Sequence, residues 1–209
     1  MSFQIQVVDL THLPPADQLL SGREQALFQA FRFPKRRGEW LGGRFALKTL
    51  AARATGALET EIELLPQPSG KPRLLVRGEE SPLAFSLTHS HGFAAAALSQ
   101  DEPFLGIDLE KIEKRLNAWA QDFFHPDELT GTDERFLTAL WTQKEALVKV
   151  LGTGLSLNSF EVRCVRGVPA FFGRAAELYK QLGSPALTVE TGERVPGFMF
   201  TVAHGRGQI

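Results

Sequence analysis

The sequence predicts an α+β protein built from two similar halves, and three observations support this prediction. The chain has 209 residues, 43% of them hydrophobic and 22% charged, which suits a globular protein with a buried core. Each half begins with a strand, continues with helices and ends with a cluster of short strands. The two series meet near Gln100–Pro103 without a low-complexity linker. We therefore expect halves at residues 1–102 and 103–209, packed as one unit.

Capping and turn residues mark the elements of the first half. Ser21 can cap a helix with Glu24 at the capping-box position, and Gly56 follows the end of a second helix. The expected elements are a strand at Phe3–Leu10, helices at Ser21–Phe31 and Arg37–Arg53, and extended runs at Glu61–Leu65, Arg73–Val76, Leu83–Leu87 and Phe93–Leu98.

The second half repeats this order of elements. The expected elements are a strand at Phe104–Leu109, helical segments at Lys111–Ala120, Pro126–Leu129, Asp133–Leu151 and Gly173–Leu182, and strands at Phe160–Val165, Val168–Phe172, Leu187–Glu190 and Phe198–Ala203.

The first strand of the second half carries two carboxylates on one face. Apolar and polar residues alternate, so Gly106, Asp108 and Glu110 point away from the leucine and isoleucine side chains between them. Two like charges side by side repel each other unless a cation lies between them, and oxygen ligands suit Mg²⁺. The alternative is an ordinary half-buried strand with a solvated polar face.

The predicted helix Asp133–Leu151 has an apolar face with a lysine near its centre. Lys144 can extend past the apolar surface to water, or it can reach an anion in a cleft. Glu145 stands at the edge of the apolar face, and Lys149 lies four residues further on. The functional interpretation is a third metal carboxylate flanked by two phosphate-facing lysines, and the alternative is a weak surface ion pair.

The overall charge and the single cysteine exclude several classes of protein. The formal net charge is −1, so no global field favours nucleic acid or a membrane. Cys164 is the only cysteine, which excludes an internal disulfide and a cysteine-built zinc site. We see no signal peptide and no apolar run of transmembrane length, so a cytoplasmic protein is expected. Local basic residues at Arg37, Arg44 and Lys48 share a helix face and can line a phosphate groove or form a solvated surface.

Two sequence motifs together resemble the phosphopantetheinyl transferases. Leu105–Glu110 (LGIDLE) followed by Trp141–Lys149 (WTQKEALVK) is similar to the paired signature of the larger, monomeric class typified by surfactin synthetase activating enzyme. Gly70–Pro72 and Phe85–Ser90 resemble two shorter motifs of the same family. The resemblance implies two α/β halves related by a pseudo-twofold axis, with the active site in the cleft between them and a monomeric protein.

The resemblance implies the reaction and the roles of the second half. The family transfers the 4'-phosphopantetheine moiety of coenzyme A to a serine of an apo carrier protein and releases 3',5'-ADP. Asp108, Glu110 and Glu145 would bind Mg²⁺. Glu145, directly or through a metal-bound water, would accept the serine proton, and Lys149 would stabilise the leaving phosphate.

The resemblance also implies the coenzyme A contacts. Lys144 would contact the pyrophosphate. Arg37, Arg44 and His89 would hold the 3'-phosphate, and Lys71 would contact adenine or phosphate. The first half would thus bind the nucleotide, and the second half would hold the metal and the catalytic motifs.

Two other functions fit the same residues. Three carboxylates would serve a Mg²⁺-dependent pyrophosphate hydrolase or nucleotidyl transferase equally well, and a non-catalytic carrier-binding module could share the fold. A hydrolase would break down coenzyme A without a protein acceptor. The sequence leaves open which carrier is served, whether Mg²⁺ or Mn²⁺ is preferred, and which residues contact the carrier.

Overall fold

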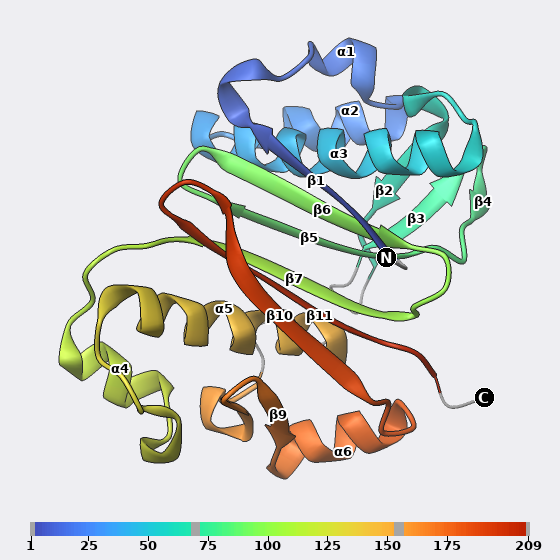
Figure 1. Cartoon of the computed structure of the whole chain (residues 1–209). Helices are drawn as coiled ribbons and strands as arrows, with labels where there is room; N and C mark the ends of the chain where they lie inside the picture. The colour runs from blue at the N-terminus through green and yellow to red at the C-terminus, as the bar shows by residue number, and fades with distance from the viewer. Residues whose placement is uncertain (1–2, 68–71, 153–156, 208–209) are drawn as a thin grey trace. The chain divides into compact units, whose positions relative to one another are not determined.

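The computed structural model of this chain describes residues 3–67, 72–152 and 157–207. The chain divides into two compact units, Met1–Gln100 and Asp101–Ile209 (Figure 1). Both units mix helices with antiparallel strands. Among the described residues, no helix combines the length and apolar character needed to cross a membrane.

The first unit packs one long helix on a three-stranded sheet in the order β1-β6-β5. Small alanines Ala94–Ala97 on β6 are fully buried, which lets the helix α3 lie close to the sheet. The elements of this unit are β1 (Phe3–Asp9), η1 (Leu10–His12), α1 (Ala16–Leu19), α2 (Gly22–Gln29), α3 (Pro34–Thr55), η2 (Glu59–Glu61), β2 (Ile62–Leu65), β3 (Arg73–Val76), β4 (Glu79–Glu80), β5 (Ala84–Ser90) and β6 (Phe93–Ser99).

Local signals explain where the helices of the first unit begin and end. Ser21 and Glu24 form the expected capping box at the start of α2. The helix α3 begins at Pro34, earlier than expected, because proline is well suited to the first helical turn. It ends at Gly56, which adopts the left-handed conformation with φ 69°.

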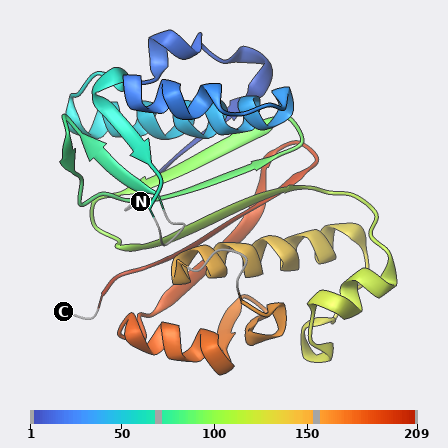
Figure 2. The same cartoon turned by 180° about the vertical axis from the view of Figure 1, so that it is seen from behind.

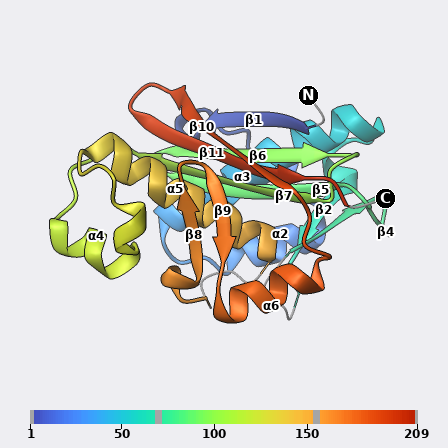
Figure 3. The same ribbon diagram turned by 60° about the horizontal axis from the view of Figure 1, so that its bottom comes forward.

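The second unit packs α5 on a sheet in the order β10-β11-β7 (Figure 2). The helix α5 also contacts β8, while α6 contacts the neighbouring strand β9 (Figure 3). The elements are β7 (Phe104–Lys111), α4 (Asn117–Phe123), η3 (Pro126–Glu128), α5 (Glu134–Leu151), η5 (Ser159–Glu161), β8 (Val162–Val165), β9 (Val168–Phe171), α6 (Gly173–Gln181), β10 (Leu187–Val195) and β11 (Phe198–Gly205).

The two units share an order of elements. In each, the first strand pairs with the last strand, and the last two strands form a hairpin. A long helix packs on this sheet, and a 3-10 turn leads from that helix into a further strand. This shared order agrees with the predicted repetition of strands and helices.

Strand pairing changes the bounds of several expected elements. The predicted helix Lys111–Ala120 is wrong in its first part, because Lys111 pairs with Phe198 and prolongs β7. The strand β10 runs on to Val195, five residues beyond the expected end, because β11 offers partners along its whole length. These extensions arise from long-range hydrogen bonds, which local sequence signals do not contain.

Candidate active site

The strand β7 presents its polar residues to the helix α5. Gly106 shows this most directly, because a Cβ atom built there would lie 2.0 Å from the carbonyl oxygen of Ala146 on α5. Asp108 and Glu110 lie on the same face as Gly106, since side chains two residues apart in a strand point the same way. Asp108 is 5% exposed. The missing side chain of Gly106 therefore lets α5 approach the two carboxylates.

Gly106→Ala is expected to destabilise the second unit by about 1–3 kcal/mol, the usual cost of overpacking. The clashing atom is backbone, so the helix itself must move, and transfer activity should fall with stability. Urea unfolding of both proteins measures the loss. Gly43→Ala is the matched control, because a Cβ there meets only Leu87 at an ordinary 3.9 Å. Equal stability of Gly106→Ala and the wild type would contradict the close approach.

The helix α5 is fixed at both ends. Asp133 caps its start by accepting a hydrogen bond from Phe136 N at 2.9 Å. Gly152 ends it in the left-handed conformation with φ 73°. Near this end, Lys149 Nζ donates to Asp108 Oδ1 at 2.8 Å and to Ile107 O at 2.7 Å. Lys149 thus joins the helix to the carboxylate strand.

Glu145 lies on α5 between the Asp133 cap and Lys149, and its carboxyl has a raised pKa. Burial raises the pKa of its carboxyl from 4.5 to about 7, and the negative charges of Asp108 and Glu110 add to this rise. Lys149 acts in the opposite direction. The structure therefore brings Asp108, Glu110, Glu145 and Lys149 into one electrostatically coupled group. An excess of carboxylates in such a group favours a bound cation.

The chemistry of this group fits a hard metal ion. All its acidic donors are carboxylate oxygens, which is the donor type that Mg²⁺ prefers. The side-chain positions of the described residues do not gather three or more His, Cys, Asp or Glu groups closely enough to hold a metal directly. One of the candidate ligands, the Asp108 carboxylate, forms an ion pair with the Lys149 ammonium. The carboxylates supply the right atoms, and side-chain movements are needed to bring them onto one ion.

The structure corrects the expected role of Lys144. Its side chain is 2% exposed, and Nζ lies 2.9 Å from Glu128 Oε2 and 2.8 Å from the carbonyl oxygens of Phe123 and Ser159. An ammonium has three donors, and these contacts use all of them. Lys144 therefore holds the second unit together, and the expected pyrophosphate contact is wrong in this structure.

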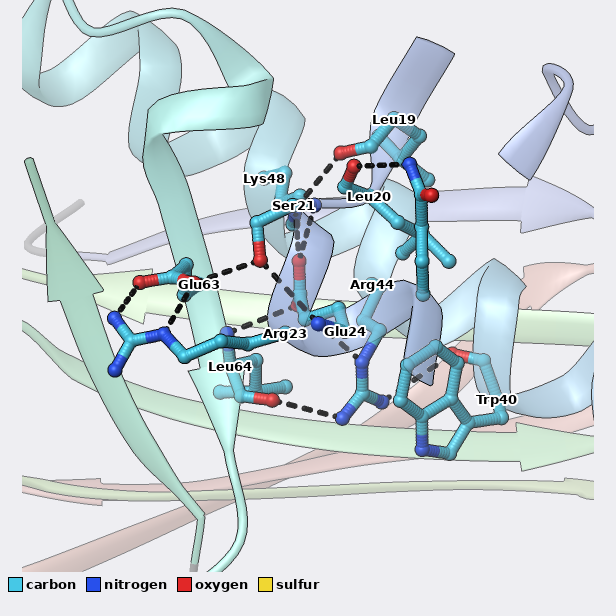
Figure 4. Close-up of polar contacts among 11 residues, drawn as sticks. Leu19, Leu20, Ser21, Arg23, Glu24, Trp40, Arg44, Lys48, Glu63 and Leu64 are labelled. Atoms are coloured by element: carbon cyan, nitrogen blue, oxygen red, sulfur yellow. Dashed lines mark hydrogen bonds and ion pairs between the residues drawn. The ribbon is translucent and has the colours of Figure 1, made fainter. Parts of the chain in front are cut away.

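A similar buried pair holds the first unit. Lys48 Nζ lies 2.5 Å from Glu24 Oε2 and donates to Leu19 O at 2.8 Å (Figure 4). The corresponding carbonyl in the second unit, Phe123 O, also precedes its glutamate by five residues. Glu24 accepts from Leu64 N at 3.0 Å, and Glu128 accepts from the backbone N of β8 residue Cys164 at the same distance. The two units thus repeat one buried glutamate–lysine arrangement.

Arg44 belongs to the first buried pair, so the expectation that it lines a phosphate groove is corrected as well. Its Nε lies 3.4 Å from Glu24 Oε1, its Nη2 donates to Leu64 O at 2.9 Å, and its guanidinium stacks on Trp40 (Figure 4). Burial lowers its pKa to about 9, and Glu24 opposes the change. A side chain buried among these partners serves the core of the first unit.

His89 and Arg37 lie nearer to solvent in the first unit. His89 Nε2 is 3.0 Å from Arg36 Nη1, and its Nδ1 is 3.7 Å from Glu39 Oε2. The guanidinium of Arg37 lies 4.5 Å from the ring centroid of Phe28. The structure therefore pairs His89 with Arg36, the residue directly before Arg37 in the sequence. Lys71 and most of its motif lie outside the described residues.

Sequence comparison places this arrangement in a known family. A sequence model of the 4'-phosphopantetheinyl transferase superfamily (ACPS) matches residues 104–184. The 4'-phosphopantetheinyl transferase HetI of Nostoc is 30% identical over 161 residues, which cover 72% of this chain and 68% of that protein. The chain belongs to the 4'-phosphopantetheinyl transferase superfamily.

Other members of the superfamily match in the same way. A putative 4'-phosphopantetheinyl transferase of Synechocystis is 31% identical over 69% of this chain, and the alignment spans 61% of that relative. A holo-[acyl-carrier-protein] synthase of Geobacillus is 31% identical over 38% of this chain and 71% of its own length. A solved ACPS–CoA complex from Chronobacterium ammoniagenes covers 50% of this chain and 97% of its own, with 21% identity and a TM-score of 0.40.

The segment matched by the superfamily model contains the coupled group of the second unit. Asp108, Glu110, Glu145 and Lys149 all lie within residues 104–184. Glu128 lies there too, although the sequence analysis assigned it no role. Its local sequence shows a capping-box pattern. The ion pair could not be predicted from this pattern, because Lys144 is sixteen residues away on another helix.

Proposed function

We propose that this chain transfers the 4'-phosphopantetheine group of coenzyme A to a serine of an apo carrier protein and releases 3',5'-ADP. The observation that carries the proposal is the coupled group in a member of this superfamily: Glu145, with its pKa near 7, between Asp108, Glu110 and Lys149. In the proposed reaction, the serine oxygen bonds to the phosphorus next to pantetheine. The bond from that phosphorus to the oxygen of 3',5'-ADP breaks.

Glu145 is proposed as the base that takes the serine proton. A carboxyl with a pKa near 7 is charged in part at neutral pH and accepts a proton more readily than an ordinary glutamate. Burial, together with the charges of Asp108 and Glu110, raises that pKa in the metal-free protein, and the three carboxylates are proposed as Mg²⁺ ligands. Bound Mg²⁺ would neutralise the charge of the pyrophosphate. Lys149, whose side chain is 28% exposed, is proposed to stabilise the leaving phosphate.

The nucleotide contacts are proposed for the first unit. Arg37 and His89 stay in the proposal as 3'-phosphate contacts, and Arg36 joins them because it lies 3.0 Å from His89. Lys71 stays as an adenine or phosphate contact. The pseudo-twofold relation, the cleft and a monomeric state, all implied by the family resemblance, belong to the same proposal. Light scattering that gives the mass of a dimer would contradict the monomer.

Intact-protein mass spectrometry of an apo carrier tests the proposed reaction. The carrier, incubated with this protein, coenzyme A and Mg²⁺, should gain one phosphopantetheine, and EDTA should prevent the gain. Fatty-acid, polyketide and peptide-synthetase carriers are tested in parallel. No gain on any of them would contradict the transferase proposal. Breakdown of coenzyme A without an acceptor would then indicate the hydrolase alternative, and intact coenzyme A would indicate a binding module.

A further inference from the structure

A line of hydrogen-bonded hydroxyl groups ties the helix α5 to the sheet of the second unit. Thr201 Oγ1 on β11 lies 2.7 Å from Thr142 Oγ1 on α5 and 2.9 Å from Thr191 Oγ1 on β10. Gln143 Nε2 donates to Thr191 Oγ1 at 3.1 Å. Thr142 and Thr201 are fully buried. The line therefore runs from the surface of the unit into its interior.

The direction of these hydrogen bonds is fixed by the number of protons. Thr142 donates its single hydroxyl proton to Ala139 O at 2.9 Å, so Thr201 must donate to Thr142. Thr191 then donates to Thr201, and the Gln143 amide donates to Thr191. Each hydroxyl proton is used within the line. No hydroxyl proton is therefore left to donate to the carboxylates of the site. The threonines act by holding the helix α5 against the strands β10 and β11.

The line meets the sheet directly beside the carboxylate strand. Thr201 is the cross-strand partner of Asp108, so the two side chains share one face of the sheet. On α5, Thr142 precedes Glu145 by three residues and Lys149 by seven, which is about 10.5 Å along a helix. Lys149 makes the second contact, to Asp108. Glu145 is thus held between two fixed points, one a hydroxyl pair and the other an ion pair.

We propose that Thr201 and Thr142 are positioning residues that set the place of Glu145 relative to Asp108. This inference rests on the proposed function, because it assigns the pair a role in the same reaction. If the hydroxyl contact is lost, the first half of α5 is free to shift against β11 while Lys149 still holds the second half. A displacement of about 1 Å at a reacting group can cost on the order of 100-fold in rate.

Thr201→Val tests the inference without leaving a buried donor unsatisfied. Thr142 keeps its bond to Ala139 O, and Thr191 lies on an exposed part of β10, where water replaces the lost partner. We expect a folded protein with kcat lowered about tenfold and the KM for coenzyme A changed by less than about twofold. Thr201→Ser should restore kcat, because it keeps the hydroxyl. Equal kcat in the Val variant and the wild type would overturn the inference.

A matched control comes from the same helix. Thr138 is fully buried, and its hydroxyl has no hydrogen-bond partner within the part of the chain that the structure describes. Thr138→Val removes the same atom but no hydrogen bond, so kcat should stay within about twofold of the wild type. A buried unsatisfied hydroxyl costs about 1 kcal/mol or more, so this variant should also be slightly more stable. An equal fall in kcat in Thr138→Val and Thr201→Val would contradict the inference, because the loss would then not depend on the hydrogen bonds of Thr201.

Two further measurements test the inference, one with a readout other than activity and one with a second variant. Hydrogen–deuterium exchange should become faster in the first half of α5 in Thr201→Val, and unchanged exchange would overturn the inference even if the wild type is active. Thr142→Val removes the same contact from the other side, and the double variant should be no slower than either single one. Additive losses would show separate roles. Absence of transfer by the wild type contradicts the proposed function alone, because the exchange result stands by itself.

Discussion

Glu145→Gln is expected to lower the rate of phosphopantetheine transfer by about 10²–10⁴-fold while the protein folds normally. The amide keeps the size of the side chain but cannot accept the serine proton, and it removes one proposed Mg²⁺ ligand. The measurement is the initial rate of carrier modification, followed by mass spectrometry. Near-normal activity would show that Glu145 is neither the base nor an essential ligand.

The same variant is expected to stabilise the metal-free protein at alkaline pH. The Glu145 pKa is about 7 in the folded protein and 4.5 without its surroundings, so the folded state binds more protons between these values. Stability from this group is therefore lost as pH rises through that range. Glutamine does not titrate, so its advantage over the wild type should grow by about 2 kcal/mol between about pH 5 and about pH 8. Urea unfolding with EDTA measures this difference.

A second glutamate on α5 supplies the control for both effects. Glu134 is exposed in the first turn of the helix, so Glu134→Gln makes the same change of charge outside the coupled group. Its transfer rate should stay within about twofold of the wild type. It should not reproduce the pH-dependent gain in stability that is expected from removing the buried Glu145 carboxyl. A pH-dependent gain of similar size in Glu134→Gln would assign the effect to net charge instead of burial.

Local patterns were sufficient to predict the carboxylate face of the second unit. The alternation along β7 places Asp108 and Glu110 together, and the helical spacing of α5 places Glu145 and Lys149 on one side. The coupling of Glu145 to Asp108 and Glu110 agrees with this pattern. These predictions needed only the geometry of one strand and one helix.

The partners of the buried lysines could not be predicted in the same way. Lys144 in the middle of an apolar face fits either a phosphate or a buried carboxylate, and only the fold brings Glu128 to it. Lys48 and Arg44 likewise share a helix face, but Glu24 comes from α2 and directs both inward. A charged residue on an apolar face shows that a partner exists. Its identity depends on contacts between elements far apart in the sequence.

Lys144→Met is expected to lower the free energy of unfolding of the second unit by about 3–5 kcal/mol, because it leaves the Glu128 carboxylate buried without its cation. Glu128 is 2% exposed and cannot reach water for compensation. Burial lowers the pKa of Lys144, while the hydrogen bond to Glu128 and its negative charge oppose that change. Urea unfolding and the midpoint of thermal unfolding measure the loss.

Lys48→Met is the matched variant in the first unit, and comparing the two separates the loss of a lysine from the isolation of a glutamate. Glu24 keeps the Arg44 guanidinium, whose Nε is 3.4 Å away, so its carboxylate is not left without a cation. The loss should therefore be smaller, about 1.5–3 kcal/mol, the range for one hydrogen bond to a charged group. A larger loss in Lys48→Met than in Lys144→Met would mean that Arg44 does not compensate. If Lys144→Met is as stable as the wild type, the buried contacts of Lys144 are not needed for the fold. The lysine of the wild type could then leave them for the pyrophosphate contact that its position on α5 first suggested.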